Sequence, residues 1–486
     1  MTQNRATVPP PRRGAPSRIA GLLAAASAMA LAACASLPPP TAARVAKPAQ
    51  AYAAATSFTA PQAEWPAQTW WTAYGDPQLN GLMDEALAGS PDLAQAEARL
   101  RKAQALTGVA RAAELPSLNL NGSIDRAKQS YNFGIPPDFV PQGYNNYGRL
   151  TLDFSWELDF WGKNRAAVAA ATSEAQAAGA DAAEARLMLS ASVASAYADL
   201  ARLYADRDIA ERSVGLREET VGLVQNRVTN GLDTQGDLRQ AQAGPSRARA
   251  ELAALDEQIA QTRNRLAALL GAGPDRGLTI TRPAPAALKP FGLPTNLAAD
   301  LIGRRPDVVA ARWRAEASSR KIDQAKAAFY PNVNLAAFIG VQALHLDQVF
   351  NSGSDIGSAG PALSLPIFEG GRLRAGLRGA QADRDGAVAA YDATLTQALR
   401  DVADVAASQR ALSARLSESR AALAADEDAY RIARLRYEGA LTNYQTVLIA
   451  EQAVLTQRTV VADLESRGFA LDVALVRALG GGFISS

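Results

Sequence analysis

The sequence predicts a mixed, mainly helical fold in which each chain supplies four strands to a lipid-facing sheet and two long helical hairpins. Three observations predict this fold class: an internal repeat, strands that alternate apolar and polar residues, and helical segments longer than globular domains use. The 486 residues include 50 Lys or Arg and 48 Asp or Glu, so the charges nearly cancel. Net charge therefore gives no reason to expect a nucleic acid partner.

Two copies of one unit make up most of the chain. Residues 90–93 (SPDL) recur as 305–308 (RPDV), and 155–165 (SWELDFWGKNR) recur as 364–374 (SLPIFEGGRLR). The two members of the second pair are separated by fewer residues than the two members of the first pair. The first copy must therefore carry a longer loop between its two strands. The predicted boundaries are 1–33 for a lipoprotein signal peptide, 34–75 for an extended N-terminal strap, 76–290 for repeat 1 and 291–486 for repeat 2.

Each copy begins with a helix, at 91–114 or 306–329, and continues with two strand-like runs. Within 150–160, Leu and aromatic residues alternate with polar ones. Such a period of two over about ten residues is typical of a transmembrane strand with one face toward lipid and the other toward water. The predicted strands cover about 117–128 and 147–160 in the first copy, and about 332–343 and 358–368 in the second.

Long helices follow the strands. No proline occurs between Pro141 and Pro245, or after Pro366, and both stretches are rich in alanine. A helix from 163 to about 230 would be roughly 100 Å long at about 1.5 Å per residue. After short turns at 231–236 and 439–443 the chain returns, which predicts long helical hairpins over about 163–270 and 372–479. Gly244-Pro245 predicts a kink in the first return helix.

The N-terminus explains the only cysteine. Four arginines without an acid precede the apolar run 19–33, which ends at Cys34 and resembles a bacterial lipobox. This predicts a covalent lipid on Cys34 and no other cofactor. Because Ala35 follows the cysteine, enteric-type sorting would release the lipoprotein to the outer membrane. One Cys and one His leave no set of residues for a transition-metal site or a Cys-His nucleophile within one chain, so no enzyme is expected.

Four strands cannot close a membrane barrel, because every backbone group in lipid must be paired and the smallest single-chain barrels have eight strands. Two chains would give eight strands with a filled lumen, and three would give twelve with an open pore. Strands that run directly into long helices predict a duct. A structural or adaptor coiled coil shares the hairpins but has no use for the strands. An enzyme would need a nucleophile elbow, phosphate loop or metal spacing, none of which occurs in the sequence.

A family resemblance rests on several motifs in their order and duplication. The chain resembles the TolC family of outer-membrane proteins and, within it, the OprM/NodT-like lipoproteins of RND efflux systems. The segments that carry the resemblance are Cys34, Trp71 with 74–79 (YGDPQL), 90–93 (SPDL), 115–116 (LP), 155–163 (SWELDFWGK), 365–372 (LPIFEGGR) and 436–439 (RYEG).

This resemblance implies a homotrimer with a twelve-stranded transmembrane β-barrel, four strands from each protomer, continuous with a long α-helical periplasmic barrel. It also implies a lipid-anchored protein of the bacterial outer membrane that extends into the periplasm. Its partners would be outer-membrane lipid, a periplasmic adaptor and an inner-membrane RND pump. The expected function is passive conduction of drugs or other small molecules. Metal-ion efflux and type I protein secretion are the alternatives.

The resemblance also suggests a gate at the hairpin tips, where the family closes its tunnel with acidic rings and tying contacts. The candidate residues are Asp233, Asp237, Arg239, Arg436 and Tyr437. At the second tip Thr446 and Ile449 stand where family members often have Asp, which argues against a second acidic ring. Alternatively, Asp233 and Asp237 are simply first-turn acids that suit the helix dipole.

Aromatic residues at the strand ends are candidates for membrane-interface belts, or else for core positions: Trp156, Phe160, Trp161, Tyr330 and Phe368. Residues 131–146 and 344–356 are predicted to be extracellular loops, and the single His345 is expected to be solvated within the second. Arg304 and Arg305, just before Pro306, are expected to be a solvated helix start.

Overall fold

The computed structural model describes residues 43–48, 51–132 and 134–485, so the predicted signal peptide and Cys34 lie outside the described residues. The chain divides into two compact units. The first joins 106–171 to 317–385, and the second joins 44–105 to 172–316 and 386–486. Each unit therefore draws on both sequence repeats, and neither repeat is a compact unit by itself.

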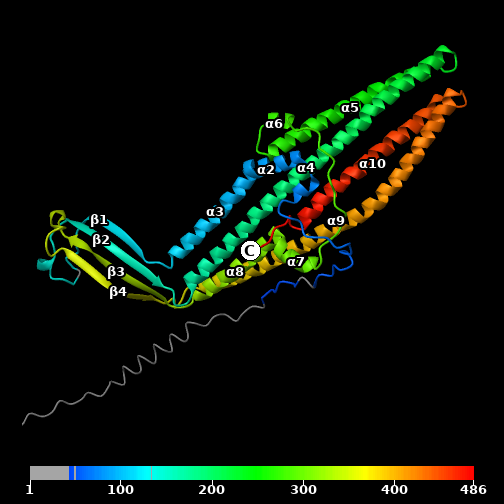
Figure 1. Cartoon of the computed structure of the whole chain (residues 1–486). Coiled ribbons are helices and arrows are strands. Elements are labelled where there is room, and N and C mark those ends of the chain that lie inside the picture. Colours follow the sequence, from blue (N-terminus) through cyan, green and yellow to red (C-terminus); the bar gives the residue numbers. More distant parts are fainter. Residues whose placement is uncertain (1–42, 49–50, 133, 486) are drawn as a thin grey trace, which may run out of the picture. The chain divides into compact units, whose positions relative to one another are not determined.

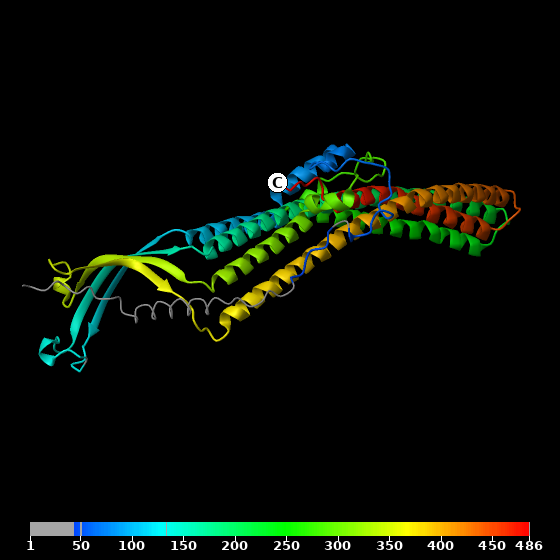
Figure 2. The ribbon, with the colours of Figure 1, turned by 90° about the horizontal axis from the view of Figure 1, so that it is seen from below.

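The first unit contains one antiparallel sheet with the order β1-β2-β3-β4. Its strands are β1 (Ser117–Ala127), β2 (Asn145–Leu158), β3 (Asn332–Ala343) and β4 (Asp355–Ser364). They lie side by side in both ribbon views (Figures 1 and 2). Pairing joins the two repeats at the centre of the sheet, where Leu152 of β2 is opposite Ile339 of β3. Among the described residues, β1 and β4 each pair on one side only, so both edges of the sheet are open.

The two faces of the sheet differ in chemistry. Leu120, Leu152 and Ile339 are register partners and form an apolar row across three strands. Their exposed fractions are 69%, 38% and 68%, which is unusual for large apolar side chains in a sheet. The adjacent positions point to the opposite face, where Asn121 and Thr151 both donate to Asp153, at 2.9 and 2.8 Å. The alternation predicted from the sequence thus separates an exposed apolar face from a hydrogen-bonded polar face.

The prediction for the last strand was wrong at both ends. A strand was expected over about 358–368, whereas β4 begins at Asp355 and ends at Ser364. The apolar residues Leu365 and Ile367 continue the period of two beyond Ser364, but Pro366 lies between them. Because proline has no N–H to donate to a ladder, pairing stops before it. Pro361 is tolerated within β4 because that strand is at the edge of the sheet.

The second unit is helical. It contains α2 (Pro77–Gly89), α5 (Gln235–Leu269), α6 (Pro274–Leu278), α7 (Leu297–Arg304) and α10 (Tyr444–Ala478). Four further helices have residues in both units: α3 (Pro91–Ala112), α4 (Lys163–Thr229), α8 (Pro306–Ala327) and α9 (Arg372–Glu438). Within the described residues, none of the helices combines the length and apolarity needed to cross a membrane.

The internal repeat is visible in the helix lengths. Helices α4 and α9 have 67 residues each, and their return helices α5 and α10 have 35 residues each. The two pairs form separate antiparallel hairpins, whose tips belong to the second unit (Figure 1). Helix α5 continues through Pro245, which lies inside it. Apolar side chains from all four helices pack together near the tips, with Val224, Leu238, Ala433 and Val447 buried in one cluster.

Candidate functional site

The two hairpin tips have the same backbone design. In the first, Gly231 adopts a left-handed φ of 69°, and the Leu232 amide donates to the Arg227 carbonyl at 2.9 Å. In the second, Ala440 adopts φ 58°, and the Leu441 amide donates to the Arg436 carbonyl at 2.8 Å. Left-handed backbone favours glycine, so Ala440 adds local strain that Gly231 avoids. The repeat therefore preserves the turn even where the residue type has changed.

One polar network joins the tips of the two hairpins. The Arg227 Nε of α4 donates to Asp233 Oδ2 at 3.0 Å, while its Nη1 donates to the Tyr437 carbonyl oxygen of α9 at 2.5 Å. The Tyr437 hydroxyl donates to the same carboxylate oxygen of Asp233. The guanidinium also lies over the Tyr437 ring, 4.2 Å from its centre. Three residues from two hairpins thus share four contacts.

This network is shielded from water. The side chains of Arg227 and Asp233 are both 9% exposed, and Tyr437 is fully buried. Burial raises the pKa of Tyr437, and the hydrogen bond to Asp233 adds to the rise, so the phenol stays protonated and donates. The hydrogen bond to Asp233 raises the pKa of Arg227. Breaking one partner of a buried pair commonly costs about 3–5 kcal/mol, because the other charge is left without compensation.

The other predicted gate residues do not enter the network. Asp237 accepts from the Thr234 amide at 3.1 Å and from its hydroxyl at 2.6 Å, which forms a capping box at the start of α5. Arg239 donates to Gln242 at 3.0 Å on an exposed surface, and the Arg436 side chain is exposed. Of the five predicted residues, the structure brings together Asp233 and Tyr437. Arg227, which completes the network, was not among the residues predicted from the sequence.

A second buried ion pair lies between the hairpins. Arg217 Nε of α4 donates to Glu451 Oε1 of α10 at 3.2 Å, and its Nη1 donates to the Gly244 carbonyl oxygen of α5 at 3.3 Å. Glu451 is 1% exposed. Burial raises the pKa of Glu451, against the opposing attraction of Arg217. The sequence reasoning missed this pair because nothing in the helical period distinguishes these two residues from solvated charges.

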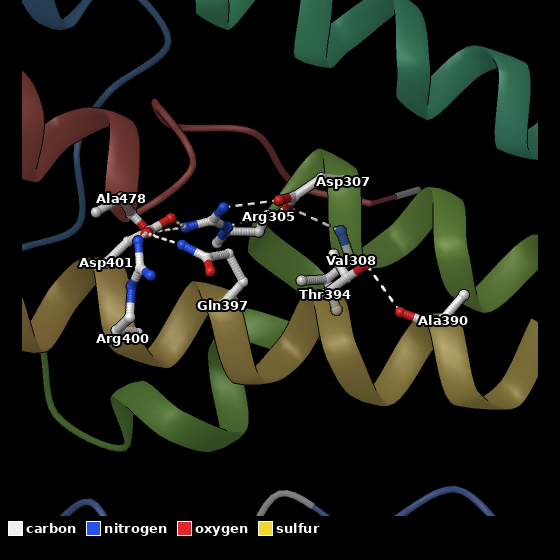
Figure 3. A network of polar contacts seen from close by, with 9 residues as sticks. All are labelled: Arg305, Asp307, Val308, Ala390, Thr394, Gln397, Arg400, Asp401 and Ala478. Carbon is white, nitrogen blue, oxygen red and sulfur yellow. Dashed lines mark hydrogen bonds and ion pairs between the residues drawn. The ribbon is translucent and has the colours of Figure 1, made fainter.

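Arg305 was predicted to be a solvated helix start, and that prediction was wrong. Its side chain is buried and donates to Asp307 at 2.6 Å, to Asp401 of α9 at 3.1 Å, and to the carbonyl oxygen of Ala478 at 3.3 Å. Figure 3 shows the guanidinium between these groups. Ala478 is the last residue of α10, where a cation offsets the partial negative charge of the helix end. Arg305 thereby joins the α7–α8 junction to both helices of the second hairpin.

Glu184 of α4 is half-buried near this cluster. Burial raises the pKa of Glu184 to about 7, and the charge of Asp307 adds to the rise, while Arg305 and Arg477 oppose it. Because the folded chain holds this proton above its ordinary pKa of 4.5, stability falls as pH rises from about 4.5 to about 7. The slope is at most about 1.4 kcal/mol per pH unit.

We expect Glu184→Gln to flatten this part of the stability profile and to stabilise the protein at pH 8 relative to the wild type. Unfolding of the detergent-solubilised chain by denaturant at pH 5 and pH 8 measures the effect. Glu211→Gln is the control, because Glu211 is on the same helix with a side chain 63% exposed. An unchanged wild-type slope in Glu184→Gln would contradict this account.

The predicted interface aromatics gather at one end of the sheet, where β2 and β4 end and β1 and β3 begin. Trp161 stacks on Tyr330 with ring centres 4.9 Å apart, and its Nε1 donates to the Pro331 carbonyl oxygen at 2.8 Å. Trp156 Nε1 donates to the Glu114 carbonyl oxygen at 3.0 Å. Phe160 and Phe368 are 64% and 89% exposed. The indole N–H groups of the two tryptophans are therefore hydrogen-bonded while their rings are exposed. His345 is exposed near the opposite end of the sheet.

Comparison with known proteins places this geometry in a family. The model of the outer membrane efflux protein family matches residues 82–272 and 297–481. The chain is 44% identical over 327 residues to "Fusaric acid resistance protein FusA" of Burkholderia cepacia, a match that covers 66% of this chain and 61% of that protein. It is 32% identical over 426 residues to "Multidrug resistance outer membrane protein MdtP" of Shigella flexneri, covering 86% of this chain and 87% of the relative.

Solved structures have the same fold. The outer membrane protein VceC of Vibrio cholerae has 46% sequence identity and a TM-score of 0.81, covering 86% of this chain and all of that one. The outer-membrane channel OprN has 29% identity and a TM-score of 0.81, covering 92% and 98%. These matches confirm the predicted fold class and the resemblance to the TolC family. The two segments that match the family model follow the two repeats, and the chain belongs to the outer membrane efflux protein family.

Proposed function

We propose that this protein is the outer-membrane channel of a tripartite, RND-type efflux system, and that three copies together form its conduit. The observation that carries the proposal is the sheet: four antiparallel strands with an exposed apolar face, a polar face and two open edges. A lipid-exposed sheet with open edges is not viable, because unpaired backbone groups cost several kcal/mol each in hydrocarbon. Three copies would pair all edges and leave a pore.

The polar side of this sheet would line the pore, while the row that contains Leu120, Leu152 and Ile339 would contact lipid. The aromatic cluster around Trp161 and Tyr330 would then mark the periplasmic interface of the membrane. Conduction through such a pore would be passive. An inner-membrane pump and a periplasmic adaptor would supply the transported molecules, and the hairpin tips would meet the adaptor.

The network of Arg227, Asp233 and Tyr437 supports a gate at these tips. It ties α4 and α9 through buried contacts that adaptor binding would have to replace. The remaining candidates, Asp237, Arg239 and Arg436, have contacts within their own hairpin or with solvent. We assign them no gating role beyond their effect on the surface that the adaptor meets.

Drugs and other small organic molecules are the proposed cargo, because the relatives are named for multidrug and fusaric acid resistance. Deletion in the native host, followed by exposure to dyes, antibiotics and metal salts, tests this. We expect greater accumulation of organic compounds and recovery upon complementation. Sensitivity to metal salts alone would favour metal-ion efflux, loss of a secreted protein alone would favour type I secretion, and no change for any compound would reject an efflux role.

A pair of glycine variants tests whether the sheet carries this function. A Cβ at Gly340 of β3 would lie 2.1 Å from the Leu150 carbonyl oxygen, whereas a Cβ at Gly360 of β4 would meet nothing within 4 Å. We expect Gly340→Ala to lose the heat-resistant oligomer and to fail in complementation. Gly360→Ala should retain both. Equal behaviour of the two variants in cells and on gels would argue against a role for the ordered sheet.

Lipid anchoring through Cys34 is a further part of the proposal, supported by the lipobox-like sequence before it. We expect Cys34→Ser to abolish incorporation of radiolabelled palmitate and to accumulate as an unprocessed precursor. Two or more acyl chains are needed for stable anchoring, so fractionation should also show weaker membrane retention of any processed chain. Ser36→Ala, two residues away, should behave as the wild type. Labelling of Cys34→Ser would exclude this site.

A further inference from the structure

The second unit contains an aromatic cavity whose lining residues belong neither to the strands nor to the hairpin tips. It has a volume of about 370 Å³ and lies between residues 63–74, 287–292 and 472–479. Cavities that bind small organic molecules commonly have about 300–1,000 Å³ and mostly apolar walls. The aromatic residues of this cavity are Trp65, Trp70, Tyr74 and Phe291. Nothing in the proposed conduction pathway requires a pocket of this kind.

The walls are rigid where the cavity meets the core. Trp70 and Tyr74 are 5% and 4% exposed, and their rings meet edge to face with centres 6.0 Å apart. Phe469 of α10 also packs against Tyr74, with ring centres 4.6 Å apart. Trp65 and Phe291 are only half-buried, so their rings are available to a ligand. A preorganised aromatic wall of this kind binds without a large ordering cost.

One half-buried carboxylate gives the cavity its polarity. Asp472 of α10 accepts a hydrogen bond from the Tyr74 hydroxyl at 2.7 Å, and among the described residues no other hydrogen bond to its side chain occurs. Burial raises the pKa of Asp472, although Tyr74 and the positive charge of Lys289 oppose the rise. With the Tyr74 hydroxyl as its hydrogen-bond donor and with partial burial, this carboxylate would be stabilised in its charged form by an added cation.

Among the charged residues that line the cavity, the one that is half-buried is negative, which favours a cation over an anion. Its charged lining residues are Asp472, Glu64 and Lys289, which give a formal charge of −1. Lys289 and Glu64 are exposed and therefore screened by solvent, whereas Asp472 is in the wall. Aromatic faces also attract cations. Arg304, which is outside the lining, adds a positive charge beside the cavity with its guanidinium 4.6 Å from the Trp65 ring centre. Within the described part of the chain, Phe291 is therefore the half-buried aromatic wall residue without such a partner.

We propose that this cavity binds a small organic monocation, such as a quaternary or protonated amine with an apolar body. The cationic group would lie next to Asp472, and the apolar body would contact Trp65 and Phe291. The site is distinct from the pore and the gate, so its test does not depend on transport.

Binding can be measured by isothermal titration of the purified full chain in a neutral detergent, with a detergent blank subtracted. The probes are benzyltrimethylammonium, benzyl alcohol and phenylacetate, which share a phenyl group and differ in charge. We expect saturable binding of the cation, about one per chain, and binding of the neutral and anionic probes weaker by roughly tenfold or more, as loss of a contact with a charged group commonly costs.

Two variants locate the site. Asp472→Asn keeps the shape and the acceptor for Tyr74 but removes the charge, and should weaken cation binding roughly tenfold or more. Asp404→Asn changes the net charge equally at a side chain that is 70% exposed, and should leave binding unchanged. Lys289→Ala removes an exposed opposing charge and should strengthen cation binding by roughly two- to fivefold.

The proposal is overturned by any of three results: no cation binding, equal binding of phenylacetate, or equal loss in Asp472→Asn and Asp404→Asn. Should Asp472→Asn fail to fold, Lys289→Ala decides the question alone, because its exposed side chain does not support the core. Weaker cation binding or no change in that variant would then reject the site.

Discussion

Replacing Asp233 by Ala is expected to leave the channel open at its periplasmic end. The substitution removes both acceptor contacts that join Arg227 and Tyr437 to the first tip, and leaves the buried Arg227 cation without its partner. A loss of about 3–5 kcal/mol from the closed state would raise the ratio of open to closed channels roughly a hundredfold or more. Single-channel conductance in planar bilayers and uptake of a large antibiotic by intact cells measure the change.

Asp237→Ala is the matched control, because the same residue type lies four positions further on but bonds only to Thr234 of its own hairpin. Loss of a capping contact costs about 1 kcal/mol locally and should not open the channel. Tyr437→Phe removes one hydrogen bond and keeps the ring under Arg227, so its conductance should lie between those of the wild type and Asp233→Ala. Equal conductance in Asp233→Ala and Asp237→Ala would contradict the prediction that this network holds the channel closed.

Local patterns in the sequence predicted most of the architecture. Period-two alternation located the strands, and long stretches without proline located α4 and α9, because both signals depend on neighbouring residues alone. The error at the C-terminal end of the last strand has a local cause, because the apolar residues Leu365 and Ile367 continue the alternating pattern past Pro366. The repeat was equally visible, because the two copies keep their turns even where Ala440 replaces glycine.

The contacts between helices could not be predicted in the same way. Arg227 and Arg436 are equivalent in the repeat and in their turns, yet one is buried in a network and the other is exposed. The difference comes from their surroundings: Asp233 follows the first arginine, whereas Thr442 occupies the equivalent place in the second copy. Asp237 shows the converse, because a first-turn acid matched the expected gate position but serves as a helix cap.

Arg305 shows most clearly that local patterns do not predict contacts between helices, because its partner Asp401 is 96 residues away in the chain. Its equivalent in the first copy is Ser90, so the repeat gives no indication of an ion pair. Two adjacent arginines before a helix are typical of a solvated surface, and one of them is indeed only half-buried. The pairing exists because α9 and the end of α10 pass the same point in the folded protein, which no local pattern records.

We therefore expect Arg305→Ala to be among the most destabilising single substitutions in the helical unit. It leaves the carboxylates of Asp307 and Asp401 without their shared cation and the Ala478 carbonyl without a donor. The loss in unfolding free energy should be about 3–5 kcal/mol. Denaturant unfolding in detergent, monitored by helical circular dichroism, measures it.

Arg304→Ala is the matched control for this substitution. The adjacent arginine contacts the Trp65 ring at a half-buried position, so its loss should cost only about 0.5–1 kcal/mol. A double replacement, Arg305→Met with Asp401→Leu, should recover much of the stability lost in Arg305→Ala, because a well-packed apolar pair can replace a buried ion pair at little cost. Equal losses for Arg304→Ala and Arg305→Ala would show that the buried network does not hold α7, α9 and α10 together. A selective loss with recovery in the double variant would show that compensation of buried charge at Arg305 holds α9 and α10 to the α7–α8 junction.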